Sequence, residues 1–169
     1  MSGGEVDFWT PNQFFLGVNQ RYGPFTLDVA ASAMNAKCGN YFSKDDNGLI
    51  KDWYGKVWCN PPYNNIGPWV SKAIREIKKF HVGQVCMLLP EGCSTKWFQL
   101  VYENADTIEF VHGRLNFGGP HALNDGKAAS PNGSILVVFT AAADGKPRVN
   151  LIDRSGQPLK GTQYTLEDF

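Results

Sequence analysis

Short apolar runs alternate with segments of helical periodicity through the first two thirds of this 169-residue chain. The apolar runs predict strands at 25–30, 40–42, 56–59, 84–89 and 107–111. The periodic segments predict three helices. The first begins at Pro11 with Thr10 as its cap, the second begins at Pro68 with an apolar face that includes Phe80, and the third follows a cap at Ser94 or Thr95. This alternation is typical of an α/β protein whose mostly parallel sheet is covered by helices on both faces.

The last third of the chain has a different pattern. Residues 114–117 predict a short strand, and 118–133 lack periodicity, so they form either a recognition loop or a plain surface loop. Two apolar runs, 134–139 and 148–152, flank Asp144-Gly145-Lys146-Pro147 and predict an antiparallel C-terminal hairpin. We expect one domain over 1–169, with a core at about 7–153 and a peripheral tail at 154–169.

Composition excludes few classes of function. The 16 basic and 16 acidic residues cancel, so net charge does not indicate nucleic acid, although a local patch can still bind it. The four cysteines have no paired CxxC spacing, which predicts small buried side chains in a reducing compartment and no metal site. The absence of a signal peptide and of an apolar stretch of ~18–20 residues predicts a cytoplasmic protein that does not enter a membrane.

Asn60-Pro61-Pro62-Tyr63 follows the predicted strand 56–59. The prolines fix φ and give the neighbouring carbonyls a defined direction, the Asn side chain adds an acceptor, and Tyr63 adds a flat face. Asp28 ends an earlier strand, and the carboxyl ends of parallel strands meet at one edge of a sheet. The pattern therefore predicts a crevice that holds a planar group bearing an amine.

An aryl amine such as adenine N6 is a poor nucleophile, because its lone pair is delocalised into the ring. Two acceptors, the Asn60 side-chain oxygen and the Pro61 carbonyl, can hold its hydrogens and direct the lone pair at an electrophile. Tyr63 would stack on the base, which must first leave the duplex. The reaction needs no metal and no covalent nucleophile.

Several further segments occur in a fixed order around this tetrapeptide. They are Trp9-Thr10-Pro11, Leu27-Asp28-Val29-Ala30-Ala31-Ser32, Gly48-Leu49 with Asp52-Trp53, Leu88-Leu89-Pro90, Gly113-Arg114-Leu115 with Phe117, and Ser134 to Phe139. The ordered set resembles the small Dam-type DNA N6-adenine methyltransferases of bacteriophages and prophages, which use S-adenosylmethionine. The resemblance covers about Asp7 to Phe139 and implies a Rossmann-like methyltransferase sheet acting on double-stranded DNA, in the host cytoplasm if the gene belongs to a phage.

The resemblance also implies roles for individual residues. The catalytic set is Asn60, Pro61, Pro62 and Tyr63, and the cofactor-binding set is Trp9, Thr10, Pro11, Asp28, Ala30, Ser32, Asp45 and Asp46. The DNA-contacting set is Trp69, Arg114 and Lys127. The family suggests a short palindrome such as GATC as the target.

The chain departs from related methyltransferases in two ways. The turn after the first cofactor strand contains no glycine, and no separate target-recognition domain is inserted, so short loops must read the DNA sequence. Cytosine N4 and a protein glutamine amide are alternative acceptors of similar geometry. A catalytically inactive nucleic-acid-binding module is the alternative from another class of function.

Overall fold

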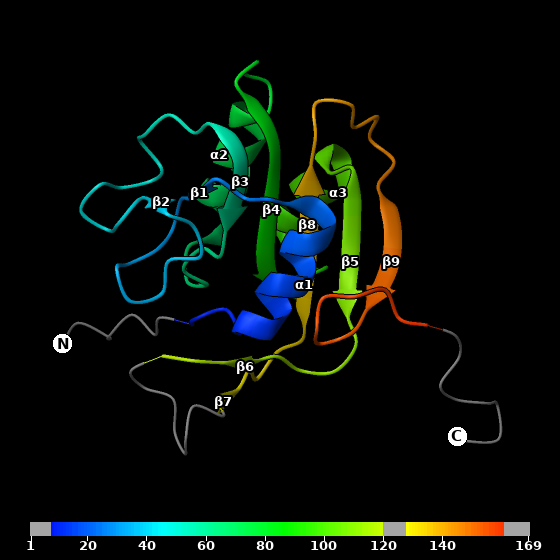
Figure 1. Ribbon diagram of the computed structural model, residues 1–169. Coiled ribbons are helices and arrows are strands. Elements are labelled where there is room, and N and C mark those ends of the chain that lie inside the picture. The colour runs from blue at the N-terminus through cyan, green and yellow to red at the C-terminus, as the bar shows by residue number, and fades with distance from the viewer. Residues whose placement is uncertain (1–7, 120–127, 161–169) are drawn as a thin grey trace, which may run out of the picture.

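A seven-stranded sheet forms the centre of the protein (Figure 1). The computed structural model describes residues 8–119 and 128–160. The strand order is β2-β1-β3-β4-β8-β5-β9, and β6 and β7 form a separate two-stranded sheet. The strands are β1 (Leu27–Asp28), β2 (Asn40–Tyr41), β3 (Gly55–Cys59), β4 (Val82–Pro90), β5 (Thr107–Val111), β6 (Asn116–Phe117), β7 (Ala128–Ala129), β8 (Ser134–Phe139) and β9 (Arg148–Ile152).

The fold class predicted from the sequence is confirmed. Neighbouring strands run parallel from β2 through β1 and β3 to β4, and again from β5 to β9. Only β8 opposes its neighbours, since it is antiparallel to both β4 and β5. The result is a mostly parallel, Rossmann-like sheet with one reversed strand.

The predicted C-terminal hairpin is wrong, because β5 lies between β8 and β9. All six residues of β8 are buried, and a strand buried on both faces is stable between two others. Four of the five residues of β9 are exposed, which suits the edge of a sheet. The segment between them crosses over β5 instead of turning back directly.

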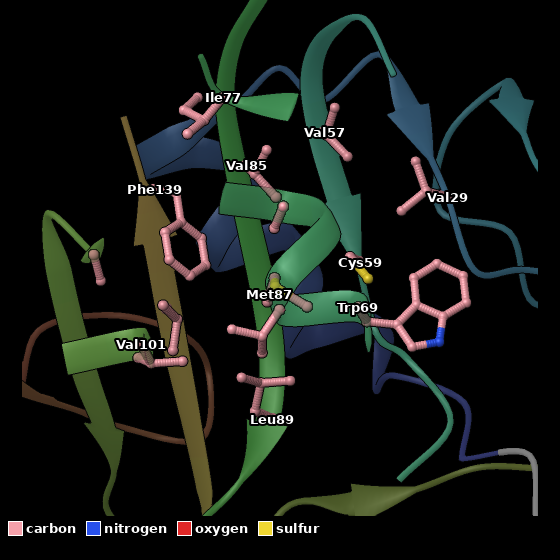
Figure 2. Close-up of a cluster of buried hydrophobic side chains, with 14 of the residues drawn as sticks. Val29, Val57, Cys59, Trp69, Ile77, Val85, Met87, Leu89, Val101 and Phe139 are labelled. Atoms are coloured by element: carbon pink, nitrogen blue, oxygen red, sulfur yellow. The ribbon is translucent and has the colours of Figure 1, made fainter. Parts of the chain in front are cut away.

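Helices cover both faces of the sheet, as predicted (Figure 1). Trp58, Cys86 and Leu88 face α1 (Asn12–Tyr22), and the alternate residues of the same strands face the opposite helices. Those helices are α2 (Ile66–Glu76) and α3 (Lys96–Asn104). Figure 2 shows the core that they cover, including Val57, Cys59, Val85, Met87, Trp69 and Val101.

The helix ends differ in part from the predictions. The N-cap of α1 is Pro11, and no side chain caps it, so Thr10 is not the cap that the sequence predicts. The helix α2 begins two residues before Pro68, which is tolerated because first-turn amides have no partner inside a helix. It ends before Phe80, which is fully exposed and not part of the apolar face. Thr95 caps α3 by accepting from the Phe98 amide at 3.3 Å, which confirms one of two predicted caps.

The cysteines of the described residues are free. Cys59 and Cys86 are buried as predicted, Cys38 is half-buried, and Cys93 is exposed, so the prediction of burial is wrong for Cys93. No helix in the described parts of the chain is long and apolar enough to cross a bilayer.

A buried ion pair ties α1 to the sheet. Glu109 of β5 is fully buried and accepts from the Arg21 guanidinium through both carboxylate oxygens and from the Tyr22 hydroxyl at 2.9 Å. Arg21 also donates to the Gly156 carbonyl at 2.8 Å, so the turn after β9 packs against α1. Burial and the neighbouring carboxylate raise the pKa of Tyr22, which keeps it a neutral donor.

Removing one partner of this pair should destabilise the fold strongly. We expect Arg21→Ala to lower the free energy of unfolding by roughly 3–5 kcal/mol, because the Glu109 carboxylate stays buried without its partner. The double variant Arg21→Ala/Glu109→Leu should lose less than the single one, since no buried charge remains. Urea denaturation measures both, and a double variant less stable than Arg21→Ala would contradict this account.

Candidate active site

The Asn-Pro-Pro-Tyr segment lies at the carboxyl edge of the sheet. Asn60 follows the last residue of β3, and the turn closes when the Asn65 amide donates to the Pro62 carbonyl at 3.1 Å, just before α2. Asp28 of β1 pairs with Trp58 in register, and the Val29 amide donates to the Trp58 carbonyl at 3.1 Å. The structure therefore brings the strand ends of Asp28 and Asn60 to the same edge, as predicted.

Residues 8–11, which we call the N-terminal strap, cross this edge beside β6 (Figure 1). The Trp9 amide donates to the Gly118 carbonyl at 2.9 Å, and the Gly118 amide donates to the Trp9 carbonyl at 3.0 Å. The Asn60 side-chain nitrogen donates to the Phe8 carbonyl at 2.7 Å and to the Thr10 hydroxyl at 3.1 Å. The strap thus joins the Asn-Pro-Pro-Tyr segment to the start of the 118–133 segment.

The side-chain oxygen of Asn60 is the unusual atom of the site. It is buried and has no hydrogen-bond partner in the described structure. Such an orphaned acceptor is uncommon in folded proteins and calls for a missing partner. An amine that binds here can supply the donor that this oxygen lacks.

Tyr63 belongs to a cluster of three aromatic rings. Phe8 stacks on it with centroids 5.3 Å apart at 30°, and Phe117 meets its ring edge-on at 6.0 Å. The Tyr63 hydroxyl is also buried without a partner among the described residues, and burial raises its pKa, so it is a neutral phenol. Phe8 already covers one face of Tyr63, which sequence reasoning missed because no motif marks Phe8.

Asp28 organises the loop that follows β1. Only 3% of its surface is exposed, and its two carboxylate oxygens accept from the Ala30 amide at 3.3 Å and the Lys37 amide at 3.0 Å. Burial raises the pKa of Asp28 to about 6, although both amides and the Lys37 charge act to lower it. Ser32 lies in the same loop, where its amide and hydroxyl donate to the Asn35 side chain.

The raised pKa of Asp28 gives a pH-dependent stability. The folded protein holds the proton of the Asp28 carboxyl group more tightly than the unfolded chain does. The contribution of this group to the free energy of unfolding is therefore complete below about pH 4 and is lost by about pH 6. The change from the ordinary 3.8 to about 6 corresponds to roughly 3 kcal/mol. The stability difference between wild type and Asp28→Asn should therefore fall by that amount from about pH 4 to about pH 7, measured by urea denaturation.

Asp46→Asn is the control for this measurement. Hydrogen bonds from Ser43 lower the pKa of Asp46, so its contribution is lost only as the pH falls below the ordinary value. The difference in the free energy of unfolding between wild type and Asp46→Asn should not fall between about pH 4 and about pH 7. A pH-independent difference for Asp28→Asn would contradict the assignment.

The other predicted cofactor residues have local roles in the structure. Asp46 accepts from the Ser43 amide at 2.9 Å and its hydroxyl at 2.7 Å, while the Ser43 hydroxyl accepts from the Asp46 amide, so the pair closes a turn. Asp45 is exposed beside it, and Ala30 is half-buried. These contacts do not themselves assign a cofactor role to either aspartate.

The three residues predicted to contact DNA have different environments. Trp69 is only 7% exposed and stacks on Trp53 at 6.4 Å, so it is a core residue, and we do not propose it as a DNA contact (Figure 2). Its place in the amphipathic pattern of α2 is the signal that favours this. Arg114 is exposed at the carboxyl edge, and Lys127 lies outside the described residues.

Arg154 is a basic residue of this edge that sequence reasoning placed in a peripheral tail. Its aliphatic stem packs over Gly113, with Cδ 3.3 Å from the position of an added Cβ, and the positive φ of 82° at Gly113 also favours glycine. A hollow of about 390 Å³ that reaches the strap is lined by Pro11, Gln13, Leu115, Asn116, Asp153, Arg154 and Ser155. Within the described ranges, no group of three or more His, Cys, Asp or Glu side chains could hold a metal ion.

An α/β sheet with an amide-bearing Asn-Pro-Pro-Tyr turn at its carboxyl edge defines a methyltransferase-like architecture. The family model described as DNA N-6-adenine-methyltransferase (Dam) matches residues 3–164, and the chain belongs to this family. This confirms the resemblance to the Dam-type enzymes of phages.

Two phage proteins show the relationship directly. The DNA N-6-adenine-methyltransferase of Escherichia phage T1 is 39% identical over 113 residues, which are 64% of this chain and 46% of that protein. The protein of the same name from Haemophilus phage HP1 is 38% identical over 110 residues, 63% of each chain. The matched region thus spans about half to two thirds of these relatives. A crystal structure of a predicted O-methyltransferase from Agrobacterium tumefaciens covers 92% of both chains at 12% identity, with a TM-score of 0.45.

Proposed function

We propose that this chain transfers a methyl group from S-adenosylmethionine to N6 of adenine in double-stranded DNA. The observation that carries the proposal is the buried Asn60 side-chain oxygen without a partner, held at the carboxyl edge of the sheet. Membership of the Dam family and the names of the two phage relatives support the same reaction.

The residues of the turn would act on the amine by position alone. The Asn60 oxygen and the Pro61 carbonyl accept its two hydrogens, draw the nitrogen toward tetrahedral geometry and direct its lone pair away from the ring. Pro61 and Pro62 stiffen the backbone that carries both acceptors. The adenine leaves the duplex to reach the turn and stacks on the Tyr63 face that Phe8 leaves free.

The cofactor would lie at the same edge, between the strap and the end of β1. The residues that we assign to it are Trp9, Thr10, Pro11, Asp28, Ala30 and Ser32, with Asp45 and Asp46 further along the chain. Thr10 would contact the cofactor through its backbone, because its hydroxyl already accepts a hydrogen bond from the Asn60 side chain. The Trp9 indole nitrogen is a buried donor without a partner in the described structure, so a polar ligand fits here. When bound, S-adenosylmethionine supplies an electrophilic methyl group on a sulfonium.

Replacing Asn60 should separate chemistry from binding. We expect Asn60→Ala to lower kcat at least 100-fold while S-adenosylhomocysteine still binds, because the substitution removes the acceptor that acts on the amine. Transfer of labelled methyl groups to DNA and calorimetric titration of the cofactor product measure the two effects. Wild-type protein that is folded but leaves DNA unlabelled would refute the proposed function.

The methylated product also separates the alternatives. Digestion of labelled DNA and identification of the base distinguishes N6-methyladenine from N4-methylcytosine, and sequencing the modified sites tests our proposal of a GATC-like palindrome. Label in protein instead of DNA would indicate a glutamine-amide acceptor. An inactive binding module would give no label and no thermal shift with S-adenosylhomocysteine.

The exposed arginines of the carboxyl edge give a prediction about DNA affinity. We expect Arg114→Ala and Arg154→Ala each to raise the KM for DNA and to reduce the slope of log affinity against log salt by about one, as for a lost phosphate contact. Arg75→Ala is the matched control, because this exposed arginine lies near the C-terminus of α2, at the opposite edge of the sheet. Equal effects of all three substitutions would contradict a DNA surface at the carboxyl edge.

A further inference from the structure

The strap holds the Asn60 carboxamide through two separate groups. We propose that Thr10 is a positioning residue which, with the Phe8 carbonyl, fixes Asn60 with its oxygen toward the substrate amine. This inference rests on the proposed methyl transfer and assigns a residue to the same site. It gives the Thr10 hydroxyl a role toward Asn60, where the family resemblance places the segment beside the cofactor.

The Phe8 carbonyl decides which end of the amide faces the strap. A backbone carbonyl can only accept a hydrogen bond, so the Asn60 atom 2.7 Å away from it has to be the nitrogen. A flipped amide would bring two oxygen atoms into contact at that distance. The oxygen of Asn60 therefore points away from the strap, where it has no partner in the described structure.

Thr10 satisfies the second hydrogen of the same nitrogen. Its hydroxyl lies 3.1 Å from the Asn60 nitrogen, and Thr10 is only 5% exposed, so little water can replace it. The hydroxyl is not used by the neighbouring helix, since α1 has no side-chain cap. With both hydrogens held, the oxygen is the remaining free group of the carboxamide.

The strap itself is anchored on both sides of these contacts. Trp9 exchanges two backbone hydrogen bonds with Gly118, at 2.9 Å and 3.0 Å, and the Phe8 ring stacks on Tyr63. These contacts place the Phe8 carbonyl and the Thr10 hydroxyl independently of Asn60. The strap is therefore a fixed support for the amide. The orientation of the Asn60 side chain does not depend on its rotamer preference alone.

Thr10→Val tests the role of the hydroxyl, because valine has a similar shape and no oxygen. We expect kcat to fall about tenfold, the effect of one lost hydrogen bond on the transition state, with the KM for DNA and the affinity for S-adenosylhomocysteine within about twofold. Thr10→Ser keeps the oxygen and should restore kcat. Thr26→Val is the control, since the Thr26 hydroxyl also accepts a hydrogen bond, from the Lys56 amide at 3.1 Å, but at the amino edge of the sheet.

Two further measurements complement this test, since amide exchange does not require turnover and Asn60→Asp does not require a tolerated valine. The side-chain amide protons of Asn60, followed by NMR, should exchange slowly in the wild type and faster in Thr10→Val, with no change in Thr26→Val. Asn60→Asp at neutral pH has no donor for the Phe8 carbonyl and should lose at least as much kcat as Thr10→Val.

The outcomes separate this inference from the proposed function. Unchanged kcat and unchanged amide exchange in Thr10→Val overturn the positioning role while methyl transfer stands. Weaker S-adenosylhomocysteine binding with intact kcat also overturns it and makes Thr10 a cofactor residue. A third outcome is possible. The Asn60 amide exchanges slowly in the wild type and faster in Thr10→Val, but the wild-type protein does not methylate DNA. This result supports the positioning contact and overturns the proposed reaction.

Discussion

The hydrogen bond from the Asn60 side chain to the Phe8 carbonyl joins residues 52 positions apart and sets the geometry of the whole site. It fixes the orientation of the amide, leaves the opposite oxygen unpaired, and connects the end of β3 to the strap. An unpaired buried acceptor costs roughly 1–3 kcal/mol in the free protein. A substrate amine that supplies the missing donor removes that cost, so the unpaired oxygen of Asn60 favours binding of the reacting group.

The sheet makes this contact possible because it holds both sides rigidly. The strand β3 lies between β1 and β4, and its last three residues, Val57 to Cys59, are buried, so the backbone that leads into Asn60 has little freedom. On the other side, α1 is packed on the sheet through Phe14 and Val18 and is tied by Arg21 to Glu109. The amide directly follows one well-anchored element, β3, and its carbonyl partner lies in the strap that leads into another, α1.

Local sequence patterns predicted the elements of this fold but not all of their partners. The continuous apolar run of β4, the Thr95 cap of α3 and the turn at Asn60 depend on neighbouring residues, and the structure has all three. Two apolar runs separated by a turn sequence do not encode whether a third strand lies between them, which is why the hairpin prediction failed. Local patterns did not identify Phe8 for the same reason, since its carbonyl contacts Asn60 and its ring contacts Tyr63, both more than 50 positions away.

The zero net charge of the chain hides an uneven distribution of its cations. At the amino edge, Lys79 pairs with Asp52 and Glu76, and Arg148 pairs with Asp106, so these positive charges are largely neutralised. Arg114 and Arg154, at the carboxyl edge, form no ion pair within the described residues. Because exposed charges act over about a Debye length of 8–10 Å, the DNA that we propose as substrate would interact at that edge with these two arginines and not with the net charge of the chain. Unpaired local cations therefore allow a chain of zero net charge to carry positive side chains at the edge of the sheet where Asn60 lies.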